Sequence, residues 1–180
     1  MLTVQVVISE GFDSATQQFV ASDSFDLRLE HSLVSLSKWE SKFCQPFLDK
    51  KERSPEELLG YIEAMTLNEN YPAGIFHTLS KENIEAINEY IGSKQTATWF
   101  NDQGPQKKSR EIITSEIIYY WMFKFTIPID CERWHLNRLL TLIRVVNEKE
   151  KPQKKMSARD LAAQQRRLNA QRRQEMGTRG

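Results

Sequence analysis

The chain opens with two stretches in which apolar residues recur at every second position: Leu2, Val4, Val6 and Ile8, separated by Thr3 and Gln5, and Phe25, Leu27 and Leu29, separated by Asp26 and Arg28. This period of two places the apolar side chains on one face of a strand and the polar side chains on the other. Glycine, aspartate and serine between residues 11 and 14 indicate the turn that joins them, and residues 17–20 could add a short strand. We therefore expect a small antiparallel sheet at the N-terminus.

From residue 33 onward, apolar residues recur at the spacing of amphipathic helices. The first helix lies in the segment HSLVSLSKWESKF and ends before Pro46. Ser54 and Glu57 form a capping box with proline at the first helical position, so a second helix begins there. Ser80 caps a third helix, which Gly92 ends. The apolar faces of these three helices comprise Leu33, Leu36, Trp39 and Phe43; Leu58, Ile62 and Met65; and Ile84, Ile87 and Ile91.

The second half of the chain is predicted to contain the central core helix. A short strand could form at residues 97–100, followed by a polar loop at 101–108. From Ser109 the pattern is helical again, and the segment IIYYWMF (117–123) is apolar on every side, which is typical of a helix buried in the centre of a protein. Pro128 is expected to end this helix.

The next helix, which Asp130 can cap, carries two contrasting stripes. An apolar stripe is expected to face the core, and a polar stripe is expected to face solvent. The apolar stripe comprises Leu136, Leu139, Leu140 and Ile143, and the polar stripe continues to Glu148. The candidate site residues on the polar face are Arg133, Asn137, Thr141 and Arg144.

Charge divides the chain into an acidic body and a basic tail. Residues 1–143 hold 14 Lys and Arg against 20 Asp and Glu, whereas residues 144–180 hold 11 against 4. We expect a globular body at residues 1–147, a charged linker at 148–156 and a basic helix or tail at 157–180. Strands followed by a block of helices are typical of an α+β fold. Here we expect a mostly helical fold, with the N-terminal sheet packed on a helical bundle and a C-terminal helix extending from it.

The tail is predicted to form one helix. A capping-box variant at Ser157 and Asp160 opens it, and Gly177 suits its stop. Its only strong apolar residues are Leu161 and Leu168. Because isolated helices of this length are marginal in water, so thin an apolar stripe cannot stabilise the helix alone.

Several kinds of contact compete for this tail helix. The helix could pack on a protein partner or on an acidic face of the body. Alternatively, its arginine pairs could neutralise the phosphates of a nucleic acid. No aromatic residue follows Trp134 to stack on bases, which disfavours nucleic acid. The tail could also serve only to keep the chain in solution. The candidate partner-binding residues are Leu161, Gln165, Arg166, Arg167, Leu168, Arg172 and Arg173.

No motif in the sequence predicts catalysis or a cofactor. Metalloprotease, serine hydrolase, phosphate-loop and dinucleotide motifs are all missing. Cys131 and His135 lie four residues apart and could share a metal ion, but a closed zinc site needs four ligands, and the other Cys and His residues have no recognisable spacing. We therefore expect no catalytic residues, no metal and no cofactor. The two cysteines, Cys44 and Cys131, are expected to be packed and reduced.

The sequence also predicts where the protein resides. No apolar run approaches the length of a membrane span, and the N-terminus lacks the layout of a signal peptide. We expect a cytoplasmic protein without a membrane partner.

Several stretches resemble a family of small proteins encoded among the tail genes of tailed bacteriophages, described as tail assembly chaperones or virion-assembly proteins. The resemblance covers the second half of the chain well and the first half thinly. The matching stretches are EIIYYWM (116–122), WHLNRLLTLIRV (134–145), Pro152 with Lys154, Lys155, Met156 and Ser157, LNAQRRQEMGTRG (168–180) and SLVSLSKWESKF (32–43).

The resemblance implies a non-enzymatic protein of the host cytoplasm that binds a tail component, such as the long tape-measure protein, during assembly. A long helical protein with exposed apolar stripes would aggregate, and a small body with an adaptable helix could cover those stripes. A permanent virion component in the tail, collar or neck fits the same features, and self-association is compatible with them. From a different class, the alternative is a nucleic-acid-binding regulator that uses the basic tail.

Overall fold

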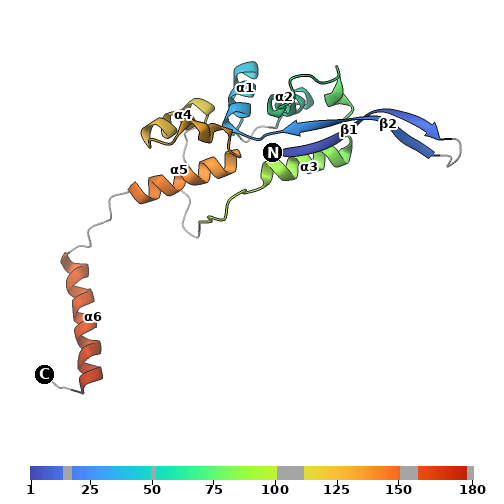
Figure 1. The fold of residues 1–180 in the computed structure, drawn as a ribbon. Helices are drawn as coiled ribbons and strands as arrows, with labels where there is room; N and C mark the ends of the chain where they lie inside the picture. The colour runs from blue at the N-terminus through green and yellow to red at the C-terminus, as the bar shows by residue number, and fades with distance from the viewer. Residues whose placement is uncertain (14–17, 50–51, 101–111, 151–157, 178–180) are drawn as a thin grey trace. The chain divides into compact units, whose positions relative to one another are not determined.

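The computed structural model describes residues 1–13, 18–49, 52–100, 112–150 and 158–177. In these residues the chain forms six α-helices, two short 3-10 helices and one two-stranded antiparallel sheet (Figure 1). This confirms the mostly helical α+β fold with its small N-terminal sheet. The chain divides into two compact units, Met1–Asn147 and Glu148–Gly180.

The sheet is a hairpin of strands β1 (Leu2–Asp13) and β2 (Gln18–Leu29). Its register aligns Val4 with Leu27 and Val6 with Phe25, so these apolar residues share one face, as the alternating pattern predicts. Ile8, expected on the same face, is 37% exposed, because the register is irregular between Val7 and Ser9. That face lies on the helices, whereas Thr3, Gln5 and Arg28 belong to the other face. The fully buried or nearly buried hairpin residues are Val4, Val6, Leu27 and Leu29.

The hairpin is longer than the sequence pattern indicates. Gly11 lies within β1 and not at the turn, and residues 18–20 continue β2 without a break. Irregularities in the register lie between Val7 and Ser9 and between Ser9 and Glu10. A bulge disrupts the strict alternation of side chains between the two faces. The alternation of apolar and polar residues in the sequence therefore stops at the bulge, although the strand continues.

The first part of the core lies between the hairpin and three helices, α1 (Leu33–Phe43), α2 (Pro55–Met65) and α3 (Lys81–Gly92). Capping boxes begin all three, and those at Ser54 and Ser80 confirm the predicted starts of α2 and α3. A 3-10 turn, η1 (Ile75–His77), joins the same core. Besides the hairpin residues, this core buries Trp39, Tyr61, Ile62, Met65, Ile75, Ile87 and Tyr90.

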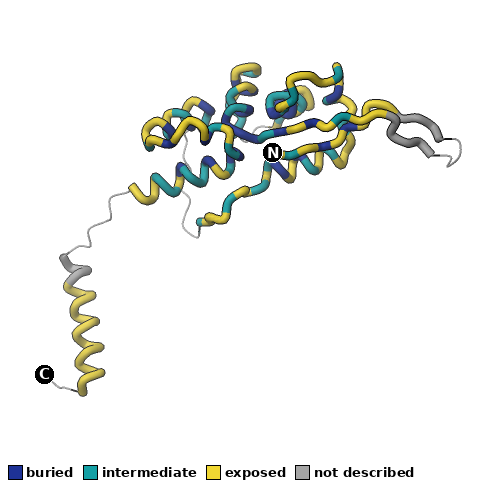
Figure 2. Tube along the Cα trace, viewed as in Figure 1, coloured by how far each residue is buried: buried dark blue, intermediate teal, exposed yellow. Residues whose placement is uncertain are grey.

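The second part of the core packs the other side of α1 against α4 (Ser115–Lys124), the 3-10 helix η2 (Ile129–Arg133) and α5 (Leu136–Glu150). Helix α1 therefore contributes to both cores. Its residues in the second core are Leu33 and Leu36, which meet Ile118, Met122, Ile127, Cys131, Leu136, Leu139 and Ile143. Figure 2 shows that α5 has a buried side and an exposed side.

Helix α4 is not the central core helix that its composition predicts. Its side chains Tyr120 and Phe123 are 60% and 71% exposed, and the buried ones, Ser115, Ile118 and Met122, lie on one face. The prediction of a fully buried helix was wrong. The aromatic residues make the segment apolar on all sides, whereas the helix packs against its neighbours through one face. The helix also begins at Ser115 and not at Ser109, after non-helical residues 112–114.

Two predicted helix ends lie elsewhere. Helix α4 stops at Lys124, before Pro128, because Thr126 takes a left-handed conformation (φ 54°). The backbone N–H of Ile127 then donates to the carbonyl of Met122, which satisfies an end carbonyl of the helix. Asp130 does not cap α5, since it lies inside η2.

Two apolar positions assigned to helix faces are more exposed than expected. Leu58 is 52% exposed, because α2 turns Gly60 and Tyr61 toward the core and leaves Leu58 outside it. Ile84 is 40% exposed, because α3 buries Ile87 and Tyr90 instead.

The two cysteines also differ from each other. Cys131 is buried, as expected, but Cys44 is exposed. Cys44 occupies the left-handed position (φ 53°) that ends α1.

The C-terminal unit contains helix α6 (Ala158–Met176). Gly177 takes a left-handed conformation (φ 61°), which confirms the predicted stop. The proposed cap at Ser157 lies outside the described residues. Of the predicted linker, residues 148–150 belong to α5 and the remainder is likewise outside the described residues.

Candidate functional site

The polar stripe of α5 is not simply a solvated face. The side-chain amide of Asn137 donates hydrogen bonds to the carbonyl oxygens of Ile91 (3.0 Å) and Ser93 (2.8 Å). The carbonyl of Tyr90 lies 3.0 Å from Nε2 of His135. These carbonyls end α3, and helix ends leave such groups without partners inside the helix. Helix α5 therefore fixes the end of α3 and the chain that follows it.

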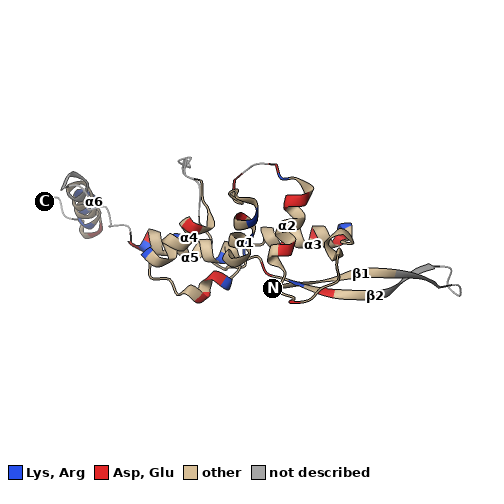
Figure 3. Ribbon diagram, turned by 90° about the horizontal axis from the view of Figure 1, so that it is seen from above, with Lys and Arg blue, Asp and Glu red and all other residues tan. Residues whose placement is uncertain are grey.

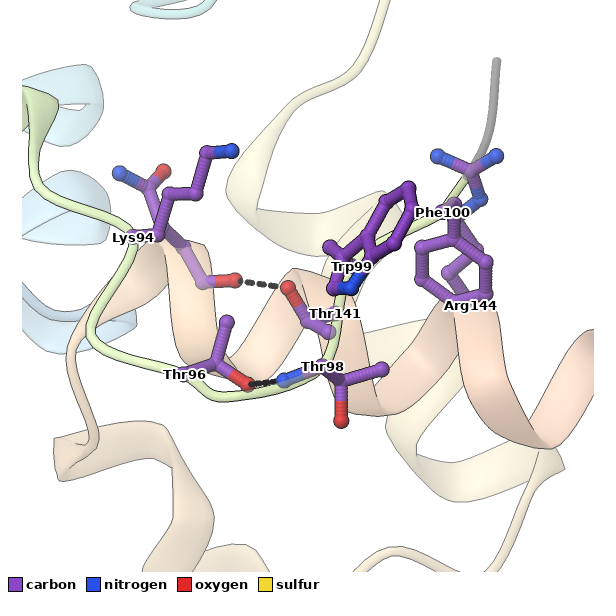
Figure 4. A pocket seen from close by; sticks show the side chains of 8 residues that line it. Lys94, Thr96, Thr98, Trp99, Phe100, Thr141 and Arg144 are labelled. Atoms are coloured by element: carbon purple, nitrogen blue, oxygen red, sulfur yellow. Dashed lines mark hydrogen bonds between the residues drawn. The ribbon is translucent and has the colours of Figure 1, made fainter.

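The chain that follows α3 forms a pocket with α5, shown in Figure 4. The pocket has a volume of about 290 Å³ and opens to solvent. Residues 97–100, which the sequence suggested as a short strand, are not a strand. They pass beside α5 as an extended segment instead. The lining residues are Lys94, Thr96, Thr98, Trp99, Phe100, Asn137, Thr141 and Arg144.

Aromatic and cationic side chains form the rim of this pocket. The guanidinium of Arg144 stacks over the ring of Phe100 at 3.9 Å from its centroid. A cation over an aromatic face is attracted by the ring's quadrupole, which orients the guanidinium. Trp99 is 74% exposed. Figure 4 shows Lys94 and the Trp99 ring on either side of Thr141, with Arg144 beside Phe100.

The polar groups of the pocket are mostly donors. The hydroxyl of Thr141 donates to the carbonyl of Asn137 (2.7 Å), and the hydroxyl oxygen of Thr96 accepts from the backbone N–H of Thr98 (3.2 Å). In the described part of the chain, the ammonium of Lys94 and the indole N–H of Trp99 have no hydrogen-bond or ion-pair partner. None of the lining residues within the described part of the chain is acidic. The arrangement therefore suits an acceptor that carries negative charge.

The structure brings together three of the four polar-face residues expected on α5. Asn137, Thr141 and Arg144 line the pocket, whereas Arg133 lies in η2 and lines a different depression with Glu30 and Lys38. The aromatic members of the pocket, Trp99 and Phe100, are absent from the expected site. Nothing in the sequence distinguishes an exposed tryptophan from a buried one, so only the fold places them there.

A second polar cluster is buried where the two parts of the core meet. Nδ1 of His31 lies 2.6 Å from the hydroxyl of Tyr61, and the rings of His31 and His135 are 4.9 Å apart. Burial, together with the neighbouring His135, lowers the pKa of His31 to about 4, and burial also lowers the pKa of His135. Both rings are therefore neutral at pH 7. The cluster links α2 to the residues that immediately precede α1 and α5.

His135 was also half of the metal pair weighed with Cys131. Its Nε2 faces the carbonyl of Tyr90, and its Nδ1 is buried without a hydrogen-bond partner. Within the described residues, no group of three or more His, Cys, Asp or Glu side chains could hold a metal ion.

Helix α6 presents its basic side chains to solvent. From Ala162 to Met176 every residue is exposed, and Leu168 is 47% exposed (Figure 2). The candidate partner-binding residues Gln165, Arg166, Arg167, Leu168, Arg172 and Arg173 all lie in this stretch. The side chain of Leu161 is outside the described residues, although its backbone is helical.

Acidic residues are prominent on helices of the body, whereas basic residues predominate in α6. Figure 3 shows acidic positions recurring along α2 and α3 of the body. In α6, five arginines stand against one aspartate and one glutamate.

The chain matches no protein-family model, no curated protein and no solved structure. Among the described helices, none has both the length and the hydrophobicity needed to cross a membrane.

Proposed function

We propose that the chain is a non-enzymatic assembly protein of a tailed bacteriophage that binds a tail component through α6. The tape-measure protein is the proposed component, and the host cytoplasm is the proposed location. The single observation that carries the proposal is the exposure of α6 from Ala162 to Met176, within the second of the two compact units.

An exposed helix of this composition needs a partner to be stably helical. Leu161 and Leu168 are seven residues apart, so they lie on the same face of α6. Gln165 and Arg172 share that face. Such a stripe resembles the anchors of a helix that lies in an apolar groove. The resemblance to tail assembly proteins supports the same reading and names the kind of partner.

The basic character of α6 predicts that the partner is acidic where they meet. Complementary charge steers two proteins together and fixes their register more than it adds affinity. The leucines would then supply the binding energy, and the arginines would supply orientation and speed of encounter.

A permanent virion component is the nearest alternative, because an exposed helix can equally become ordered in a neighbouring subunit. Mass spectrometry of purified particles and of complexes captured on this protein from infected cells separates the two roles. A chaperone is recovered with a long helical tail protein from the lysate and is absent from particles. A fixed copy number in particles would replace the chaperone role with a structural one, and capture of no tail protein from either source would contradict the proposal.

A further inference from the structure

We propose that the pocket lined by Trp99 and Arg144 is a second binding site on the body, and that it takes a carboxylate side chain from an acidic segment of a protein. This site is distinct from α6. The inference rests on the proposed function only in taking the ligand to be a protein.

The charge of the pocket is the first support. Among the described residues that line it, the ionisable ones are Lys94 and Arg144, and both are cationic. The body as a whole is acidic, with 14 Lys and Arg against 20 Asp and Glu in residues 1–143. A cationic pocket on an acidic body is therefore a local feature that selects an anion at this point.

The polar lining is the second support. A carboxylate has two oxygens and about four acceptor positions. The ammonium of Lys94, the hydroxyl of Thr98 and the indole N–H of Trp99 are donors without hydrogen-bond partners in the described part of the chain. Bonds from charged donors to a carboxylate are roughly twice as strong as neutral ones.

The exposed aromatic ring is the third support. Trp99 is 74% exposed beside a guanidinium that Phe100 holds in place. Tryptophan and arginine are the residues most enriched among those that dominate protein–protein binding. The ring can cover the methylene groups of an acidic side chain while the donors bind its oxygens.

A protein segment fits these observations better than a nucleic acid. Binding to a chain of phosphates requires several cations along the strand, whereas the described lining of this pocket has two and the body is acidic. Among the described lining residues, Trp99 is the one exposed aromatic ring, and a stacking platform uses successive rings.

The test uses the full chain labelled with nitrogen-15 and follows its tryptophan indole N–H signals by NMR. The sequence has four tryptophans, and a Trp99→Phe variant identifies the signal of Trp99. The probe is a hexaglutamate peptide blocked at both ends, with blocked hexaglutamine as the uncharged control. Because α6 contains no tryptophan, binding of the probe to its arginines does not move this signal directly.

We expect hexaglutamate, and not hexaglutamine, to shift the Trp99 signal in a saturable way. Lys94→Gln should weaken this binding about threefold, which corresponds to an exposed ion pair. Lys94→Gln combined with Arg144→Gln should weaken it at least tenfold. The matched control is Lys38→Gln, which removes an exposed charge from α1 and should change binding less than twofold.

Three kinds of result would overturn the inference. One is a Trp99 signal that does not move while backbone signals of α6 do, a result that leaves the proposed function intact. Another is an equal response to hexaglutamine, or an equal loss in the Lys38→Gln control. The third is a stronger response to a thymidine hexanucleotide than to hexaglutamate, which would assign the pocket to nucleic acid.

Discussion

The side-chain amide of Asn137 on α5 donates a 2.8 Å hydrogen bond to the backbone carbonyl of Ser93, 44 residues earlier in the chain. A second hydrogen bond from the same amide reaches the carbonyl of Ile91. Together they hold the chain after α3 against α5, and this chain forms one wall of the Trp99 pocket.

Asn137→Ala should therefore destabilise the body and loosen the pocket. It leaves the carbonyl oxygens of two half-buried residues without their donor, and the loss should be about 1 kcal/mol, at the lower end of the cost of an unsatisfied polar group. Urea unfolding measures the loss, and the indole signal of Trp99 should shift in the same variant. Asn147→Ala, at an exposed position of the same helix, should change the free energy of unfolding by no more than about 0.5 kcal/mol. Equal losses in the two variants would show that Asn137 does not hold the segment.

The buried carboxylate of Glu40 on α1 is predicted to stabilise the packing of α4 on α1. Oε2 of Glu40 accepts from the backbone N–H of Ser115 (2.7 Å), and Oε1 accepts from that of Phe47 (2.8 Å). The N–H of Ser115 lies in the first turn of α4, where a negative charge is favoured. Glu40→Ala should cost about 2–4 kcal/mol, since each bond to a charged group contributes about 1.5–3 kcal/mol. Thermal unfolding compared with the exposed Glu89→Ala variant measures it, and a loss no larger than in that control would contradict the prediction.

The buried histidine pair predicts that stability falls in mild acid. The pKa of His31 is lowered to about 4 in the folded protein, against 6.5 in the unfolded chain. The unfolded state therefore binds the proton more readily, so the stability is complete above pH 6.5 and is lost as the pH falls toward 4. Between pH 7 and pH 5 the loss from His31 should be about 2 kcal/mol.

Unfolding in urea at several pH values tests this dependence. His31→Gln should flatten the curve between pH 7 and pH 5, because the group that takes up the proton is removed. His77→Gln, which removes an exposed histidine, should leave the curve unchanged. An unchanged slope in the His31→Gln protein would assign the acid sensitivity to other groups.

Two glycines in helices should respond oppositely to alanine. A Cβ atom on Gly60 would lie 2.7 Å from ring atoms of Phe43, whereas one on Gly92 would meet nothing within 4 Å. Alanine is better than glycine in a helix by up to about 1 kcal/mol. Gly92→Ala should therefore stabilise the protein by about 0.5 kcal/mol, while Gly60→Ala should destabilise it by about 1–3 kcal/mol through overpacking. Stabilisation by both substitutions would show that the ring of Phe43 can shift to accommodate the added Cβ at little cost.

Features set by neighbouring residues could be predicted from the sequence. The capping box of Ser54 and Glu57, the stop at Gly177 and the inward face of the hairpin depend on residues a few positions apart. Features set by distant contacts could not. Which side of α4 faces the core depends on α1, so Tyr120 and Phe123 were misassigned.

The candidate site shows the same division. The polar stripe with Asn137, Thr141 and Arg144 is visible in the sequence as a helical repeat. The segment after α3 that completes the pocket is not visible in the sequence. The hydrogen bonds that hold it join residues 44 and 46 positions apart. The left-handed conformation of Thr126 could not be predicted from the sequence either, because β-branched residues seldom adopt it.

The central claim is that α6 binds a protein through its leucines, and one set of capture assays tests it most directly. Wild-type protein is compared with three variants: L161A/L168A, one with Arg166, Arg167, Arg172 and Arg173 all changed to Gln, and the polar control N169A/Q174A. Each is used to capture tail proteins from infected cells and is tested for a mobility shift with DNA and RNA. We predict that the leucine variant loses capture, that the arginine variant retains more of it, and that the control behaves as wild type. Capture that survives loss of the leucines, together with tight, steeply salt-dependent nucleic-acid binding that disappears in the arginine variant, would contradict the claim.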